Sequence, residues 1–278
     1  MVNLLLAIIS SALVSICMRL STDKVKGNVG MLAMNYLMCM AVAGAYTGYD
    51  RLFPAAEGLG RTIGMGAVNG VLYLGSFALL QMNVKKNGVV LSAIFMKLGL
   101  LVPMVLSIFL FGEIPAPLQI VGFVIAVLAI FMINAGGDTG TARSRWALIV
   151  LLLAGGAGDA MAKIFEQTGS PELSSQFLFY TFATAFVLCI GMMLIKKEKL
   201  GKMEVLYGLL VGVPNYFSAK FLLQALSSVP AVIVYPTSNV GTLLMVTIAG
   251  VLFFGEKLGR RQWIAAGIIL AAIVLLNI

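Results

Sequence analysis

Residues 111–119 read Phe-Gly-Glu-Ile-Pro-Ala-Pro-Leu-Gln, and residues 254–262 read Phe-Gly-Glu-Lys-Leu-Gly-Arg-Arg-Gln. Each stretch lies between two long apolar runs, and the two are 143 residues apart. Laying the chain on itself at this offset, without gaps, also matches polar residues elsewhere, which indicates an internal repeat. These matches are Tyr73 with Tyr216, Gln81 with Gln224, and Asn134 with Asn277.

The composition excludes a soluble domain. Hydrophobic residues make up 60% of the 278 residues, charged residues only 11%, and the mean hydropathy is +1.02. Soluble domains carry about 25% charged residues. The net charge of +8 comes from Lys and Arg between apolar runs, where it governs membrane orientation rather than nucleic-acid binding. The three cysteines lie inside apolar runs without metal-site spacing, and we expect no metal, cofactor or catalytic residue.

The apolar runs predict an all-α integral membrane protein with ten transmembrane helices, because each run has about the length that crosses a bilayer. The predicted spans are 2–20, 30–48, 62–82, 88–111 and 117–135, then 146–167, 173–195, 204–226, 229–254 and 262–278. Residues 1–137 and 144–278 are the two predicted repeats. Because each holds five spans, an odd number, the second repeat enters the membrane inverted relative to the first. Such inverted repeats suit a carrier that opens a midplane site to either side.

With five-plus-five spans and a Phe-Gly-Glu motif joining spans four and five of each half, the sequence resembles the drug/metabolite transporter superfamily, EamA type. The resemblance implies a multi-pass protein of the inner (plasma) membrane that moves a small molecule. Some nucleotide-sugar members look similar in using a span-four lysine, a place that Lys97 holds here.

The positive-inside rule orients the spans, because most of the 19 basic residues follow odd-numbered spans. They are Arg19, Lys24, Lys26, Lys85, Lys86, Arg143, Arg145, Lys196, Lys197, Lys199, Lys202, Lys257, Arg260 and Arg261. This places the odd connections in the cytoplasm and both termini outside. Members of the family commonly resemble one another in keeping both termini in the cytoplasm, so the predicted orientation departs from theirs.

Lys97, near the middle of span four, is the first candidate site residue, because a charge there is costly and indicates function. We interpret it as a substrate-facing cation; the alternatives are an ion pair with Asp159 or a bond to a helix C-terminal carbonyl. Asp159 and Lys163 are one turn apart on span six and are candidates for coupling or an ion pair. Asp159 is the candidate proton-coupling group in a chain without His, an ordinary ion pair being the alternative. Lys163, near the helix end, is expected to pair or to snorkel.

Span eight carries a stripe at four-residue spacing that includes Tyr216 and Lys220, and span three repeats it with Asn69 and Tyr73. We interpret these residues as lining a substrate cavity, with interhelical hydrogen bonding as the alternative. Pro236 in span nine removes a backbone hydrogen bond, so Thr237 and Asn239 are expected to satisfy freed backbone groups or to meet substrate.

These residues predict a secondary active transporter of a small polar metabolite, driven by protons or by exchange. Three lysines inside spans against one deep carboxylate favour an anionic or zwitterionic substrate. An amino-acid or drug exporter and a lipid flippase subunit remain alternatives, and a laterally open groove would favour the flippase. A membrane-embedded enzyme is the least favoured, since such enzymes use clustered carboxylates, His or metal. The expected partners are the bilayer and the small-molecule substrate; the sequence does not define an oligomeric state.

Overall fold

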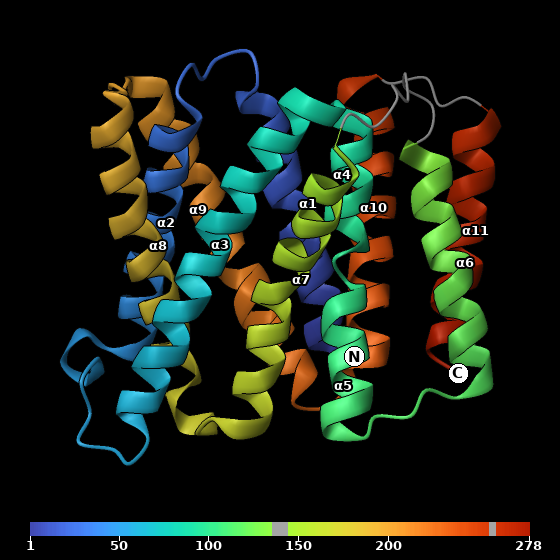
Figure 1. Cartoon of the computed structure of the whole chain (residues 1–278), viewed down its shortest axis with the longest axis horizontal. Helices are drawn as coiled ribbons and strands as arrows, with labels where there is room; N and C mark the ends of the chain where they lie inside the picture. The colour runs from blue at the N-terminus through green and yellow to red at the C-terminus, as the bar shows by residue number, and fades with distance from the viewer. Residues whose placement is uncertain (135–143, 256–259) are drawn as a thin grey trace. The chain divides into compact units, whose positions relative to one another are not determined.

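The computed structural model describes residues 1–134, 144–255 and 260–278, and within these ranges all regular secondary structure is helical (Figure 1). Glu256, Lys257 and Arg143, which contribute to the motif and to the orientation argument, lie outside the described residues. The helices are α1 (Val2–Ser21), α2 (Asn28–Thr47), α3 (Leu59–Asn87), α4 (Val89–Leu98), α5 (Leu101–Phe111), α6 (Pro117–Asn134), α7 (Arg145–Thr168), α8 (Ser174–Lys196), α9 (Lys202–Leu226), α10 (Ala231–Phe254) and α11 (Arg260–Leu276), with short 3-10 turns at Tyr49–Arg51 and Pro171–Leu173.

Within the described residues, eight helical segments are long and apolar enough to cross a membrane. One of them, Ser92–Phe111, includes most of α4 and all of α5. Two shorter apolar helices, Pro117–Met132 and Trp263–Leu276, correspond to the predicted spans five and ten. The all-helical membrane fold is therefore confirmed, and every predicted span coincides with a helix or a pair of helices.

Span four differs from the prediction, because it is interrupted at Gly99 and Leu100 rather than continuous. At the interruption Gly99 N donates to the Met96 carbonyl (3.2 Å) and Leu100 N to the Lys97 carbonyl (3.4 Å), so bonds to the third residue back replace the α-helical pattern. Pro103 explains the position, since proline lacks an N–H and its ring clashes with the carbonyl four residues earlier. That carbonyl belongs to Gly99.

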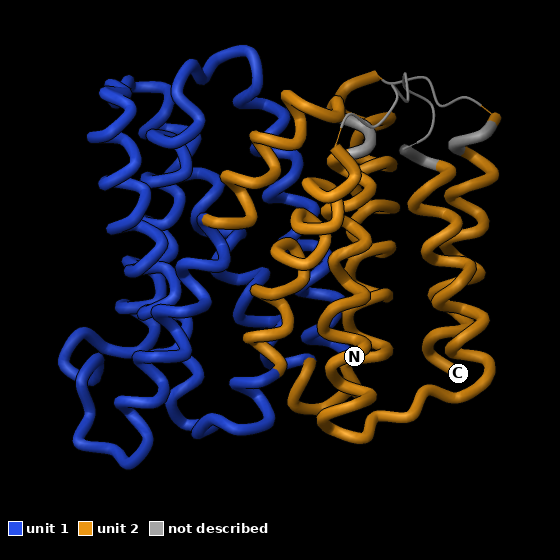
Figure 2. The backbone as a smooth tube through the Cα atoms, in the orientation of Figure 1, with its two compact units in different colours: residues 1–74, 164–225 blue, residues 75–163, 226–278 orange. Residues whose placement is uncertain are grey.

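The chain forms two compact units, coloured separately in Figure 2. Unit 1 contains residues 1–74 and 164–225, and unit 2 contains residues 75–163 and 226–278. Neither unit coincides with one of the sequence repeats of residues 1–137 and 144–278. Each unit combines helices from both halves of the sequence.

Helices that correspond under the 143-residue offset pack against each other inside each unit. In unit 1, α2 packs on α8, and in unit 2, α6 packs on α11. Figure 1 shows both pairs running in opposite directions: α6 rises from the loop after α5, whereas α11 descends to the C-terminus. Antiparallel partners are the arrangement expected of corresponding helices in inverted repeats.

Glycines bring two further helix pairs of unit 1 into close contact, and these two pairs also correspond to each other under the 143-residue offset. A Cβ on Gly70 of α3 would lie 2.5 Å from the Thr181 carbonyl oxygen of α8, and one on Gly212 of α9 would lie 2.6 Å from the Asn35 carbonyl oxygen of α2. Small residues permit this close backbone approach in membrane helices. Thus α3 packs on α8 much as its counterpart α9 packs on α2.

Two acidic side chains join the α1–α2 and α8–α9 connections at one end of unit 1. Glu204 accepts from Lys26 N (2.9 Å) and Gly27 N (3.1 Å), and Glu198 accepts from Gly30 N (2.7 Å), at the N-terminus of α2. Carboxylates are favourable there because the first N–H groups of a helix lack partners. The exposed basic side chains at this end are Arg19, Lys24, Lys26, Lys196, Lys197, Lys199 and Lys202.

Candidate functional site

Two opposite charges meet in unit 2 beside the interruption between α4 and α5. Lys97 lies in the last turn of α4, Asp159 lies in α7, and the two interact electrostatically. Both residues are partly buried, with neither fully enclosed. The C-terminal end of a helix carries a partial negative charge that favours a cation, so the end of α4 and Asp159 both stabilise the Lys97 ammonium.

Glycine contacts between α7 and the interrupted span bring these charges together. A Cβ on Gly99 would lie 2.7 Å from Gly156 N, and one on Gly155 would lie 2.9 Å from the Met96 sulfur. Gly155 and Gly156 therefore seat α7 directly against the end of α4. Asp159, about one helical turn further along α7, consequently reaches the neighbourhood of Lys97.

Tyr235 of α10 joins the same region, because its hydroxyl donates to the Asp159 backbone carbonyl (2.6 Å). The side-chain amide of Asn239 donates to the Tyr235 carbonyl (3.1 Å), close to Pro236. Thr237 Oγ1 accepts from the Asn277 side chain (3.2 Å). Asn239 therefore bonds to a backbone carbonyl, but not to that of Val232, which Pro236 frees. Thr237 joins α10 to Asn277, just after α11.

A second pair of opposite charges in unit 2 joins a buried lysine to a partly buried glutamate. Lys163 Nζ lies 2.8 Å from Glu113 Oε1, and the Lys163 side chain is only 1% exposed. Glu113 Oε2 accepts from Ala231 N (2.7 Å) and Val232 N (3.4 Å), the first N–H groups of α10. Glu113 thus caps a helix and neutralises a buried lysine.

Sequence reasoning assigned no role to the Glu113 carboxylate, because it follows a Gly in what reads as a connecting loop. Lys163 was expected to pair along its own helix or to snorkel, whereas its partner in the structure lies in the connection between α5 and α6. One feature pointed to a partner for the start of α10: this helix follows Pro230, which has no side-chain group that could cap it. Lys97 and Lys163, the two lysines of unit 2 that lie inside predicted spans, thus each face a carboxylate, so these spans carry no surplus of positive charge.

The remaining predicted residues lie in unit 1. Tyr73 and Tyr216 both pack on Phe182, with ring centroids 6.1 and 6.4 Å away. Tyr216 is fully buried, and its hydroxyl has no hydrogen-bond partner among the described residues. The Asn69 side chain donates to Thr181 Oγ1 (3.4 Å). These residues are packed in an aromatic core in this structure.

Lys220 is only partly buried and has an aromatic partner in the same unit. Its ammonium lies 3.0 Å from the centroid of the Tyr46 ring, a cation–π contact. Tyr46 is 61% exposed near the end of α2. The long side chain therefore reaches from α9 toward the end of a neighbouring helix, as a snorkelling lysine does.

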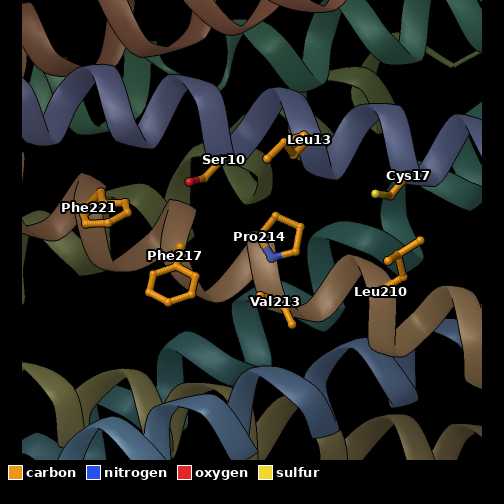
Figure 3. A pocket seen from close by; sticks show the side chains of 8 residues that line it. All are labelled: Ser10, Leu13, Cys17, Leu210, Val213, Pro214, Phe217 and Phe221. Atoms are coloured by element: carbon orange, nitrogen blue, oxygen red, sulfur yellow. The ribbon is translucent and has the colours of Figure 1, made fainter. Parts of the chain in front are cut away.

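Unit 1 also contains a pocket of about 630 Å³ between α1 and α9, which the sequence did not indicate (Figure 3). Pro214 of α9 is one of its walls, and a proline inside a helix removes the bond to the residue four earlier. That residue, Leu210, also lines the pocket. The full lining is Ser10, Leu13, Cys17, Leu210, Val213, Pro214, Phe217 and Phe221.

Comparison with known proteins relates this chain to membrane transporters. The profile of the EamA-like transporter family matches residues 145–278. An uncharacterized protein of Haemophilus influenzae is 24% identical over 285 residues, covering 98% of this chain and 96% of that protein. One crystal structure of a protein resembles the fold with a TM-score of 0.76 and 15% identity, covering 99% of this chain and 94% of that one. At such identity the likeness concerns the fold alone.

Proposed function

We propose that the chain is a secondary active carrier of a small zwitterionic metabolite. The match of residues 145–278 to the EamA-like transporter family supports membership of the EamA-type drug/metabolite transporters. The proposed substrate class rests on one observation, the partly accessible Lys97–Asp159 pair beside an interrupted helix. Discontinuous helices of this kind form the midplane substrate sites of many carriers.

The two charges suit a zwitterion better than a simple anion. A substrate carboxylate takes the place of Asp159 on Lys97, and the substrate's ammonium takes the place of Lys97 on Asp159. No charge is then left unpaired inside the membrane, where an uncompensated charge is costly. An anion alone satisfies Lys97 and leaves Asp159 unpaired unless Asp159 binds a proton, which is the route by which transport of an anion would be proton-coupled. In the second pair Lys163 is buried and Glu113 also accepts from the first N–H groups of α10, and we assign this pair a structural role.

The antiparallel packing of α2 on α8 and of α6 on α11 supports the proposal of inverted five-helix repeats. Alternating access then follows from exchange of conformation between the two repeats, which a pseudo-twofold axis relates. The glycine contacts of α3 with α8 and of α9 with α2 support the same relation. Proton or substrate gradients supply the driving force.

A ligand panel on the purified protein tests the substrate class. We expect neutral amino acids, as zwitterionic probes, to raise the melting temperature of the wild type more than dicarboxylates do. Lys97→Met and Asp159→Asn should each weaken binding about 10- to 100-fold, the loss expected for one charge-assisted hydrogen bond. Lys86→Met, which removes an exposed lysine, is the matched control. If dicarboxylates bind best and Asp159→Asn leaves their binding unchanged, the zwitterion proposal is wrong.

Membrane orientation can be measured separately. The basic end of unit 1 supports a cytoplasmic location for the α1–α2 and α8–α9 connections, and hence external termini. We expect alkaline phosphatase fused after Ile278 to be active and green fluorescent protein fused there to be dark. The same two reporters inserted after Lys199 should give the opposite pattern. A fluorescent C-terminal fusion contradicts the orientation.

A lipid flippase would need a groove that accepts a charged head group. The pocket between α1 and α9 lies partly open, with Leu13 and Leu210 each about half exposed. None of its eight lining residues carries a charge. The pocket therefore offers no charged partner for a phospholipid head group. We accordingly propose a carrier of a soluble metabolite and not a lipid flippase.

A further inference from the structure

The pocket between α1 and α9 is lined by residues of unit 1 alone, whereas Lys97 and Asp159 belong to unit 2, and the two sites differ in chemistry. Its walls are aliphatic and aromatic side chains of unit 1. A volume of about 630 Å³ is in the range of small-molecule sites, which are mostly apolar with a few polar groups for orientation. Beside the pocket, the hydroxyls of Ser11 and Ser218 are hydrogen-bonded at 2.6 Å and hold α1 to α9.

Ser10 is the polar group that distinguishes this pocket from a simple packing defect. It is only 8% exposed, and its hydroxyl has no hydrogen bond to any residue that the structure describes. Figure 3 shows the Ser10 oxygen directed into the space between the two helices. Serine in a helix commonly bonds to the carbonyl four residues back, as Ser15 does to Ser11 (3.1 Å) in the same helix. The Ser10 oxygen is not one of the fully buried side-chain atoms without a partner, so it opens to the pocket, where a hydroxyl can donate to a ligand or accept from it.

The opposite wall is aromatic. The rings of Phe217 and Phe221 are stacked, with centroids 5.7 Å apart and planes inclined by 23°. The ring of an aromatic ligand can pack on these two side chains by offset stacking or by edge contacts. A charged ligand would lose its hydration without gaining a partner, since the lining carries no charge.

We propose that this pocket binds a neutral, lipophilic molecule with an aromatic ring and one hydrogen-bonding group, the ring against Phe217 and Phe221 and the polar atom on Ser10. An acyl chain has no polar atom to offer Ser10 and no ring for the aromatic wall. The pocket shares no residue with the proposed substrate site, so its test is separate from the test of the proposed carrier activity.

Fluorine NMR of 5-fluoroindole with the full-length protein in phosphatidylcholine–phosphatidylglycerol nanodiscs tests the proposal. Indole has a single N–H donor and no charge, so it suits the Ser10 oxygen. We expect saturable broadening of the fluorine signal beyond that of empty nanodiscs, reversed by unlabelled indole. Ser10→Ala should weaken binding about threefold to tenfold, the effect of one neutral hydrogen bond. Val213→Trp should abolish saturable binding by filling the pocket.

Two controls make the result specific. The probe 5-fluoro-1-methylindole lacks the N–H, so the wild type should bind it more weakly than 5-fluoroindole, and Ser10→Ala should remove the difference. Val187→Trp adds the same ring to the exposed face of α8 and should change nothing. If Val213→Trp misfolds, as judged by circular dichroism and gel filtration, Leu210→Phe replaces it.

Three outcomes would overturn the proposal. The first is the absence of saturable binding. The second is binding that survives filling of the pocket, which places the probe elsewhere. The third is binding in lipid-free detergent that disappears in nanodiscs, which identifies a lipid acyl chain as the occupant.

Discussion

Lys163→Met is expected to lower the free energy of unfolding by about 3–5 kcal/mol, the usual cost of removing one partner from a buried ion pair. The Lys163 side chain is 1% exposed and lies 2.8 Å from Glu113. Methionine keeps most of the volume and removes the charge, so the Glu113 carboxylate loses its counter-ion. Unfolding in mixed micelles, titrated with SDS and followed by circular dichroism, measures the change.

The double variant Lys163→Met with Glu113→Gln separates charge from packing. Neither position of the pair is charged in the double variant, so we expect this variant to be more stable than Lys163→Met alone, even though glutamine caps α10 less well than glutamate. Asp50→Asn disrupts a pair at 3.9 Å whose two side chains are about 80% exposed, and should change stability by less than about 0.5 kcal/mol. Equal losses in the single and double variants would show that packing, not charge, is responsible.

Gly156→Ala is expected to destabilise unit 2 by about 1–3 kcal/mol, the typical cost of overpacking, and to abolish ligand binding at the proposed site. A Cβ at this position would overlap the Gly99 carbonyl oxygen and lie 2.6 Å from Val102 Cβ. Either α7 or the end of α4 must move away. Because Lys97 and Asp159 lie on these two helices, the distance between their charges changes as well.

Gly267→Ala is the matched control for the effect of a helical glycine. This residue of α11 has open space where a Cβ would lie, so alanine should stabilise the protein by up to about 1 kcal/mol. Melting temperature and ligand binding are measured on both variants. The comparison separates the effect of the Gly156 contact from the effect of replacing any helical glycine by alanine. Unchanged ligand binding in folded Gly156→Ala would contradict the proposed role of the glycine contact.

The fold was largely predictable because hydrophobic length is a local property of the sequence. Each predicted span coincides with a helix or, for span four, with a pair of helices. The EamA match over residues 145–278 supports the family resemblance drawn from the Phe-Gly-Glu motifs. The interruption at Gly99 was missed. A proline inside an apolar run, such as Pro103, can bend a helix or interrupt it, and the sequence alone does not decide between the two.

The candidate site was predictable only where a charge stood inside an apolar run. Lys97 and Asp159 were identified on that ground, and their mutual interaction was one of the alternatives considered. The partner of Lys163 was missed because Glu113 reads as a loop residue, and only the folded structure brings the loop to the start of α10. The pairing of charges on which the proposed substrate class rests is therefore a property of the folded chain.

The composition of the two units has a consequence for biosynthesis. Unit 1 takes residues 1–74 and then residues 164–225, with much of unit 2 between them. A ribosome that has delivered residues 1–163 to the membrane has completed neither unit, and α2 still awaits α8. The early helices must therefore remain in the bilayer without their final partners while the later ones insert. Assembly of this protein is governed by the arrival of its last helices.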